Sequence, residues 1–311
     1  MRVAAIDIGT NSVLLTVAEA TQGTLKPVLE HATITRLGKG VDRNRRLHPD
    51  RVDATLACLA RYAELIADAG VVEVAVVGTS AMRDARGGDE FRDRVEALLG
   101  VRPRVISGEQ EARLTFAGAL LEIDVNGPVV VVDIGGGSTE IIFGVAAGQG
   151  VVSSAVSLNV GSVRLFERYL LSDPPGAEEL AATRAEVRAA LRTVTRPPAG
   201  ATLIGVAGTV TTLLAIERGL ATYDPRCIHN HRLHVDTLRR LSRRLATLPL
   251  AERRQLAGLE PERADVIVAG ACILVEIAAW TGAGDVVVSD RGVRWGLIRS
   301  LTQGSSQASP F

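Results

Sequence analysis

The sequence predicts an α/β protein made of two related halves. Strand-like and helix-like segments alternate along the chain, as they do in α/β domains. One short phrase also occurs twice, as DIGTNS at 7–12 and as DIGGGS at 133–138. Each copy follows one apolar strand-like run and precedes another, so we expect each to form the turn of a β-hairpin.

The first half is predicted to contain three helices. We expect helices at 49–69, 89–99 and 108–121, strands at 3–6, 13–17, 25–37, 72–77 and 104–106, a glycine turn at 37–41 and a loop at 78–84. The helix at 49–69 opens with Pro49, which is tolerated in a first turn, and the spacing of Val52 and Leu56 gives it an apolar face.

The second half repeats the hairpin and adds longer helices. We expect strands at 129–132, 140–145, 202–206 and 285–288, helices at 177–195, 235–247 and 261–280, and a closing helix to about residue 301. Proline and glycine at 173–176 and 196–198 bound the helix at 177–195. The small, polar stretch 304–310 is expected to be a frayed tail.

Composition indicates a globular protein of two domains. The chain has 311 residues, 47% of them apolar, and a formal net charge of zero. No overall basic field favours nucleic acid, so any preference for anions must come from local placement. No apolar run reaches the length of a membrane span, the start leaves no room for a signal peptide, and three distant cysteines fit a reducing compartment. We therefore expect a soluble, cytoplasmic protein.

The repeated turns favour phosphate chemistry. Turns of glycine and small polar residues let backbone N–H groups approach an anion. Asp7 and Asp133, at the ends of the incoming strands, would repel a bare phosphate, so their expected role is to hold a divalent cation that bridges to it. A third turn, at 207–211, places Gly208 and Thr209 at an expected helix N-terminus, which also favours an anion. We expect a cleft between the halves with phosphate in it.

The segment SGEQEAR at 107–113 has two interpretations. Ser107 and Gln110 have the spacing of a capping box, and Glu109 and Glu111 suit the positive end of a helix dipole. The alternative is that a carboxylate of this helix orients and deprotonates a water molecule.

Four motifs together resemble a known family. IDIGTNS at 6–12, GTSAMR at 78–83, SGEQEAR at 107–113 and DIGGGSTE at 133–140 look like those of the exopolyphosphatase and guanosine-pentaphosphate phosphohydrolase (Ppx/GppA) family, over essentially the whole chain. That family belongs to the actin, Hsp70 and sugar-kinase superfamily. The resemblance implies two duplicated actin-like (ribonuclease H-like) domains with a central cleft, at 1–120 and 121–311. The last helix, about 293–302, is a candidate to pack back on the first domain.

The resemblance also implies roles for individual residues. Glu111 would be the general base, and Arg83 would bind substrate phosphate. Asp133 and Glu140 would organise Mg²⁺ or the attacking water, Asp7 is a further candidate for the metal, and Mn²⁺ is an alternative to Mg²⁺. The phosphate-binding residues would be Gly9, Thr10, Asn11, Ser12, Gly135, Gly136, Gly137, Ser138, Gly208 and Thr209. The second turn is expected to lie nearer the reacting phosphoryl group, because Thr139 and Glu140 follow it.

The implied activity is Mg²⁺-dependent release of terminal orthophosphate from inorganic polyphosphate. The substrate alternative is guanosine pentaphosphate, and the resemblance is compatible with a homodimer that binds neither nucleic acid nor membrane. Two other classes stay open: an ATP-dependent kinase of the same superfamily, and a non-catalytic sensor of polyphosphate or alarmone. The larger family members carry further helical domains that this chain lacks, so we expect a preference for short polyphosphate.

Three features depart from the pattern or imitate a site. Trp295 stands where the family commonly has Glu, so no role is transferred to it. The loop CIHNHRLH at 227–234 superficially resembles a metal site, although its spacing matches no zinc pattern closely. The basic run at 43–46 is either a solvated turn or a guide for a polyanion, and the arginines of 239–244 are expected to form an exposed helix face.

Overall fold

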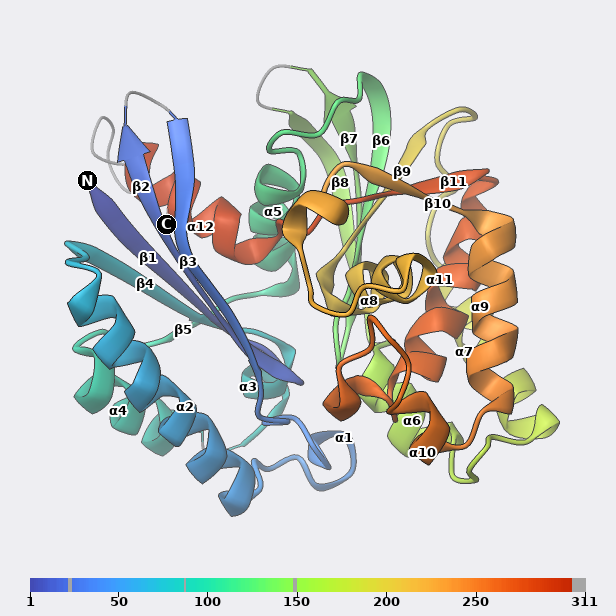
Figure 1. Ribbon diagram of the computed structural model, residues 1–311, viewed down its shortest axis with the longest axis horizontal. Coiled ribbons are helices and arrows are strands. Elements are labelled where there is room, and N and C mark those ends of the chain that lie inside the picture. The colour runs from blue at the N-terminus through green and yellow to red at the C-terminus, as the bar shows by residue number, and fades with distance from the viewer. Residues whose placement is uncertain (22–23, 87, 148–149, 304–311) are drawn as a thin grey trace. The chain divides into compact units, whose positions relative to one another are not determined.

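The computed structural model describes residues 1–21, 24–86, 88–147 and 150–303 (Figure 1). Contacts divide the chain into two compact units. Unit 1 consists of Met1–Gly118 together with the chain from Val293 onward, and unit 2 is Ala119–Gly292. The expected tail at 304–310 lies outside the described residues.

Unit 1 is built on a five-stranded sheet of order β3-β2-β1-β4-β5. Its strands are β1 (Arg2–Ile8), β2 (Ser12–Thr21), β3 (Thr24–Ile34), β4 (Glu73–Gly78) and β5 (Arg104–Val105). The first three form an antiparallel meander, whereas β4 and β5 run parallel to β1. Six helices belong to this part of the chain: α1 (Val41–Asn44), α2 (Pro49–Asp68), α3 (Ser80–Asp84), α4 (Gly88–Leu99), α5 (Gly108–Ala119) and α12 (Val293–Gln303).

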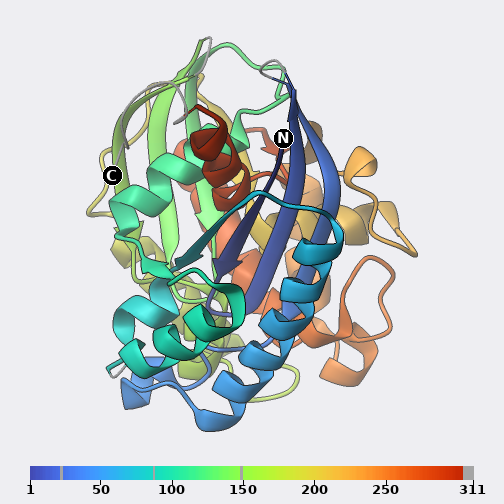
Figure 2. The same ribbon diagram turned by 90° about the vertical axis from the view of Figure 1, so that its left-hand side faces the viewer.

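Alternation along β1 places one set of its side chains in a buried core. Ile6 and Ile8 pack with Leu59 of α2 and Phe91 of α4 in one apolar cluster. The helix α12 packs against β1, β2 and β4. It also lies beside α5, so closely that a Cβ on Gly296 would overlap the backbone of Leu114 (Figure 2).

Unit 2 contains a six-stranded sheet of order β10-β11-β9-β6-β7-β8. Its strands are β6 (Gly127–Ile134), β7 (Thr139–Ala146), β8 (Val151–Leu158), β9 (Thr202–Val206), β10 (His231–His234) and β11 (Asp285–Val288). Read from β8, the order and directions of the first five strands equal those of unit 1, and β10 is an additional edge strand. The predicted α/β class and the duplication are confirmed.

Four helices of unit 2 pack around the apolar helix α11 (Ile267–Thr281). The helices of this unit are α6 (Ser162–Tyr169), α7 (Ala177–Leu191), α8 (Ala207–Arg218), α9 (Val235–Thr247), α10 (Leu250–Arg253) and α11, with short 3₁₀ turns η1 (Pro225–Cys227) and η2 (Pro261–Arg263). Helix α11 contacts α6, α7, α8 and α9, and its residues are buried on nearly all sides. A helix that is apolar all round is a core helix.

Several predicted boundaries were wrong. The expected loop at 78–84 contains helix α3, the strand expected to reach residue 37 ends at Ile34, and the helix expected to reach 195 ends at Leu191. The helix expected at 261–280 begins as the 3₁₀ turn η2 and continues as α11. The 227–234 segment, interpreted as a loop, ends in strand β10. Helix α6 and strand β8 were not predicted. Across the described ranges, no helix is both long and apolar enough to cross a bilayer.

Candidate functional site

The two copies of the turn have the same backbone geometry. In the first, the N–H of Gly9 donates to the carbonyl of Ser12 at 3.0 Å. In the second, Gly135 donates to Ser138, also at 3.0 Å. A Cβ would lie 2.9 Å from the carbonyl oxygen of Ser12 at position 9 and 3.1 Å from that of Ser138 at position 135. Both positions are therefore too crowded for a side chain and favour glycine. The sequence repeat is therefore a structural repeat.

The first turn is fastened to the segment that follows β3. The carbonyl of Thr10 accepts from the N–H of Gly38 at 2.8 Å, and that of Asn11 accepts from Thr35 and Arg36 at 3.1 and 2.9 Å. The hydroxyls of Thr10 and Ser80 lie 3.2 Å apart. Within the described chain, the N–H groups of Thr10 and Asn11 have no acceptor. Hydrogen bonds thus fix the carbonyl groups of the turn, and its two N–H groups are available to bind an anion.

Two buried side chains of the same region also lack hydrogen-bond partners among the described residues. These atoms are Oδ1 of Asn11 and Oγ1 of Thr35. Buried polar atoms are nearly always satisfied, so exceptions often mark a site for a ligand or an ion. Asn11 was predicted as a substrate residue, whereas Thr35 was missed because its burial depends on the loop that packs over it.

The second turn is fastened by the beginning of helix α6. The N–H groups of Ser162 and Val163 donate to the carbonyls of Gly135 and Gly136, both at 2.9 Å. A Cβ on Gly161 would overlap the backbone of Gly136. The N–H groups of Gly136 and its neighbour Gly137 find no acceptor in the ranges that the structure describes.

The second hairpin sets two carboxylates directly opposite each other. Asp133 on β6 is in register with Glu140 on β7. Both are buried, at 8% and 1% exposure, and Glu140 Oε1 accepts a 2.7 Å hydrogen bond from Ser157. Opposed residues have Cβ atoms about 4.5–5.5 Å apart, and two like charges there are unfavourable without a proton or a cation. In the first hairpin the corresponding residue opposite Asp7 is Leu14.

This carboxylate pair fits Mg²⁺. The ion prefers oxygen ligands and is usually bound through one or two carboxylates plus substrate phosphates. No group of three or more His, Cys, Asp or Glu side chains that could hold a metal ion occurs in the described residues. Asp133 and Glu140 supply two carboxylates with the oxygen donors that Mg²⁺ prefers.

The predicted base and the predicted arginine form an ion pair in unit 1. Arg83 Nη1 lies 2.9 Å from Glu111 Oε2 and also donates to the carbonyl of Ile106 at 2.8 Å. The Glu111 side chain is 9% exposed. Helix α3 thus presents Arg83 to the first turn of α5, and the pair holds both side chains in a defined geometry.

The two glutamates of SGEQEAR have different environments. The capping box is confirmed: Gln110 N–H donates to Ser107 Oγ at 3.2 Å, and Ser107 N–H donates to the Gln110 side chain at 3.0 Å. Glu109 is exposed and pairs with Arg113, four residues on. The cap therefore explains the start of the helix and Glu109, but it does not explain the burial of Glu111.

The third turn begins helix α8, as predicted. Ala207 has φ 68°, a strained value for a residue with a side chain. Its neighbour Gly208 lies under the guanidinium of Arg263, which a Cβ at 208 would overlap. Thr209 packs on Gly270 of α11, where a Cβ would lie 2.6 Å from its methyl group. Arg263, distant in sequence, was not predicted and adds a cation to this helix N-terminus.

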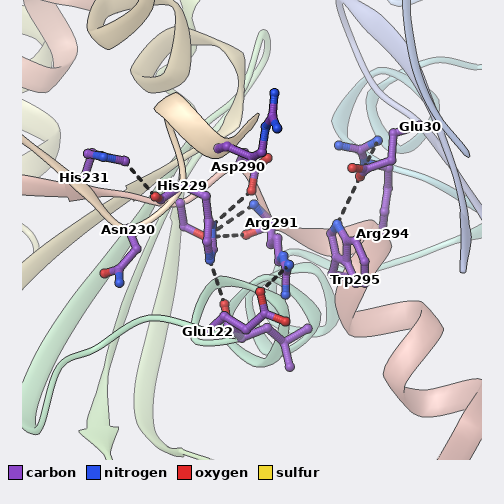
Figure 3. Close-up of polar contacts among 12 residues, drawn as sticks. Glu30, Glu122, His229, Asn230, His231, Asp290, Arg291, Arg294 and Trp295 are labelled. Atoms are coloured by element: carbon purple, nitrogen blue, oxygen red, sulfur yellow. Dashed lines mark hydrogen bonds and ion pairs between the residues drawn. The ribbon is translucent and has the colours of Figure 1, made fainter. Parts of the chain in front are cut away.

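The remaining motifs have structural partners. Trp295 donates its indole N–H to Glu30 at 3.2 Å, and Arg294 donates to the carbonyl of Leu15 at 3.2 Å, which attaches α12 to the sheet of unit 1 (Figure 3). The arginines of 239–244 are exposed, as predicted.

The predicted residues are distributed over both units. Asp7, the turn at 9–12, Arg83 and Glu111 lie in unit 1. The turn at 135–138, Asp133, Glu140, Gly208 and Thr209 lie in unit 2. Unit 1 brings Arg83 and Glu111 into contact, and unit 2 brings Asp133 and Glu140 into register.

The chain is similar in sequence and in fold to known proteins. The chain is 39% identical, over 96% of its length and 98% of the relative, to a Mycobacterium tuberculosis protein called exopolyphosphatase 2. Among solved structures, an exopolyphosphatase-like protein matches with a TM-score of 0.91 at 34% identity, covering 98% of this chain and 99% of that one. The Aquifex aeolicus member of the Ppx/GppA family matches with a TM-score of 0.83 at 35% identity, covering 99% of both chains. The model of the Ppx/GppA phosphatase family matches residues 16–304, and the chain belongs to this family.

Proposed function

We propose that the protein is an exopolyphosphatase that hydrolyses the terminal phosphoanhydride bond of inorganic polyphosphate in a Mg²⁺-dependent reaction. The observation that carries the proposal is the ion pair between the buried Glu111 and the partly exposed Arg83, an acceptor for a proton beside a cation for phosphate. The name of the Mycobacterium tuberculosis relative, exopolyphosphatase 2, supports the same substrate.

In this proposal Glu111 acts on water. Its carboxylate orients the attacking water molecule and accepts a proton from it as the water oxygen bonds to the terminal phosphorus. The bridging P–O bond breaks, orthophosphate is formed, and the shortened polyphosphate is the leaving group. Such general-base catalysis contributes roughly 10²- to 10⁴-fold. Arg83 then binds phosphate oxygens with the same guanidinium that pairs with Glu111. The exposed, Arg113-paired Glu109 has no comparable surroundings.

The glycine turns bind phosphate in the proposal. The N–H groups of Thr10 and Asn11 in unit 1, and of Gly136 and Gly137 in unit 2, have no acceptor among the described residues and suit phosphate oxygens. The start of α8 at Gly208 adds helix N–H groups, since its N-cap side chain forms no hydrogen bond.

Asp133 and Glu140 are the proposed residues for Mg²⁺, because they are opposed, buried and equipped with oxygen donors. When bound, the ion would neutralise charge on the phosphate oxygens. Asp7 remains a weaker candidate, since Leu14 supplies no second carboxylate in its register.

Phosphate release measured on three substrates tests the function. Purified protein with Mg²⁺ is given short polyphosphate, long polyphosphate or guanosine pentaphosphate, with no acceptor. We expect orthophosphate from polyphosphate, fastest from short chains. Faster release from guanosine pentaphosphate would favour the alternative substrate, dependence on an acceptor would indicate a kinase, and tight binding without release would indicate a sensor.

A further inference from the structure

Two stretches of chain connect the units, and one histidine contacts both. The chain passes from unit 1 to unit 2 after Gly118 and returns after Gly292. Residues 121–122 follow the first passage, and residues 290–291 precede the second. His229, from the segment that imitates a metal site, lies between these stretches within unit 2 (Figure 3).

The two ring nitrogens of His229 contact different stretches. Nε2 lies 2.9 Å from the carbonyl oxygen of Leu121. Nδ1 lies 3.0 Å from Oδ1 of Asp290, and the side chains of His229 and Asp290 are each 12% exposed. Asp290 Oδ1 has no hydrogen-bond partner in the described chain, so its contact with the ring is a close approach without the geometry of a hydrogen bond. The hydroxyl of Ser289 lies 3.5 Å from the same ring nitrogen.

Acceptor groups and one hydroxyl face the ring of His229. The carbonyl of Leu121 faces Nε2, and the carboxylate of Asp290 and the hydroxyl of Ser289 face Nδ1. A carbonyl and a carboxylate only accept hydrogen bonds, whereas a hydroxyl can also donate one. The ring contacts both connecting stretches through these neighbours, and the contacts themselves join the stretches.

Two further links join the same stretches. Arg291 donates to Glu122 at 2.7 Å and so connects the returning stretch directly to the outgoing one. Asn230 donates its N–H to the carbonyl of Val288 at 2.8 Å, and its side-chain oxygen accepts from the N–H of Asp124 at 3.3 Å. We call His229, Asn230, Asp290 and the Arg291–Glu122 pair the clasp.

We propose that His229 is a positioning residue that fastens the two connecting stretches to each other and so restricts bending of the chain between the units. Rotation about a two-stranded connection requires dihedral changes in both stretches, and residues with few packing contacts absorb such changes. A Cβ on Gly292 would meet no atom within 4 Å, so this part of the connection is uncrowded. The clasp is the restraint that we propose, and it does not depend on the identity of the substrate.

Hydrogen exchange tests the fastening. His229→Ala removes both ring contacts, and His229→Gln keeps one amide donor. The hydrogen bond that the substitution removes joins the ring to a backbone carbonyl, and loss of such a bond raises an opening equilibrium roughly 2- to 10-fold. We expect amides in 119–126 and 289–292 to exchange faster by that factor in His229→Ala, and by less in His229→Gln. The matched control is His234→Gln, at an exposed histidine outside the clasp. Unchanged exchange in His229→Ala would overturn the proposal.

A distance measurement tests the restriction of bending. Spin labels are placed on Glu64→Cys in α2 and Ala182→Cys in α7, both exposed, in a Cys227→Ser background, since Cys58 and Cys272 are buried. We expect a broader label-to-label distance distribution with His229→Ala than with His234→Gln. A residue with a merely structural role would lower the unfolding temperature and leave the distribution unchanged, and that result would contradict the proposal.

The variant Glu122→Gln keeps the test decisive if His229→Ala does not fold. Glu122 is 64% exposed, so the substitution removes the charge pair with Arg291 without disturbing the core. We expect a smaller broadening in the same direction. Neither measurement uses substrate, so failure here is distinguishable from failure of the proposed function.

Discussion

The two copies of the glycine turn share a backbone but differ in what surrounds them. The turn at 9–12 is held by the segment after β3, and its hairpin sets Asp7 opposite Leu14. The turn at 135–138 is held by the start of α6, and its hairpin sets Asp133 opposite Glu140. The same turn backbone therefore occurs in both units, whereas the opposed pair of carboxylates occurs in the second hairpin and not in the first.

The opposite asymmetry applies to the predicted base. Glu111 and Arg83 belong to unit 1, the unit whose hairpin lacks the second carboxylate. We therefore propose that the two units have separate tasks: Glu111 and Arg83 of unit 1 would accept the proton and bind phosphate, and Asp133 and Glu140 of unit 2 would bind the metal. Substitutions of Glu111 or Arg83 should then lower turnover without weakening metal binding, and substitutions of Asp133 or Glu140 should weaken metal binding.

The largest expected effect is that of Glu111→Gln. The amide cannot accept the proton of water, so turnover should fall by about 10²- to 10⁴-fold, the usual contribution of a general base. The assay is phosphate release from polyphosphate, with thermal unfolding as the check on folding. Glu109→Gln, two residues away on the exposed face, is the matched control and should keep normal turnover. Equal losses in the two variants would remove Glu111 from the role.

The glycines that support the turns should rank next. In Gly161→Ala the new methyl overlaps the backbone of Gly136, which cannot move independently of the turn. We expect a loss of about 1–3 kcal/mol in the free energy of unfolding, as for other overpacking changes. In Gly38→Ala the nearest overlap is with the Thr10 methyl group, a side chain.

The Gly38→Ala variant should therefore lose less stability than Gly161→Ala. Thr10→Ser removes the methyl and keeps the hydroxyl, so the double variant should regain part of the loss. Urea unfolding gives the free energy of unfolding of the wild type, Gly161→Ala, Gly38→Ala and the double variant Gly38→Ala/Thr10→Ser. Equal losses of stability in Gly161→Ala and Gly38→Ala, or no recovery of stability in the double variant, would contradict the distinction between a turn held against backbone and a turn held against a side chain.

Of these substitutions, Thr35→Val should change the stability of the protein least. Removing a buried hydroxyl without a partner in the described chain should leave stability unchanged or raise it. If Thr35 donates to phosphate, KM for polyphosphate should rise by roughly 10-fold while kcat changes little, since a hydrogen bond to a charged group is lost. An unaltered KM would restrict the phosphate contacts of unit 1 to the turn itself.

Much of the fold could be predicted because local patterns determined it. Apolar runs around each turn gave the hairpins, Ser107 and Gln110 gave the start of α5, and the predicted bounds of β9, α9 and β11 agree with the structure. In these elements, propensity, capping and periodicity all favour the same structure.

The elements that were missed depend on contacts distant in sequence. Helix α6 has no side-chain N-cap: its first N–H groups are capped by carbonyls of the turn at 135–138. Strand β8 is a largely exposed edge strand in which serines interrupt the apolar residues, so regular alternation is absent. The position of Arg263 over Gly208 and the burial of Thr35 arise only when separate segments pack.

A measurement of metal affinity tests most directly whether the second turn, and not the first, binds the metal. Mn²⁺ replaces Mg²⁺, and electron paramagnetic resonance of the free ion gives its affinity for the wild type, Glu140→Gln and Asp7→Asn. Glutamine at 140 keeps the size of the side chain and an oxygen for the Ser157 hydroxyl. We predict that Glu140→Gln weakens binding by at least about 10-fold, since even partners of metal ligands contribute that much, and that Asp7→Asn weakens it less. Unchanged affinity in Glu140→Gln, or a larger loss in Asp7→Asn, would contradict the assignment of the metal to the second turn.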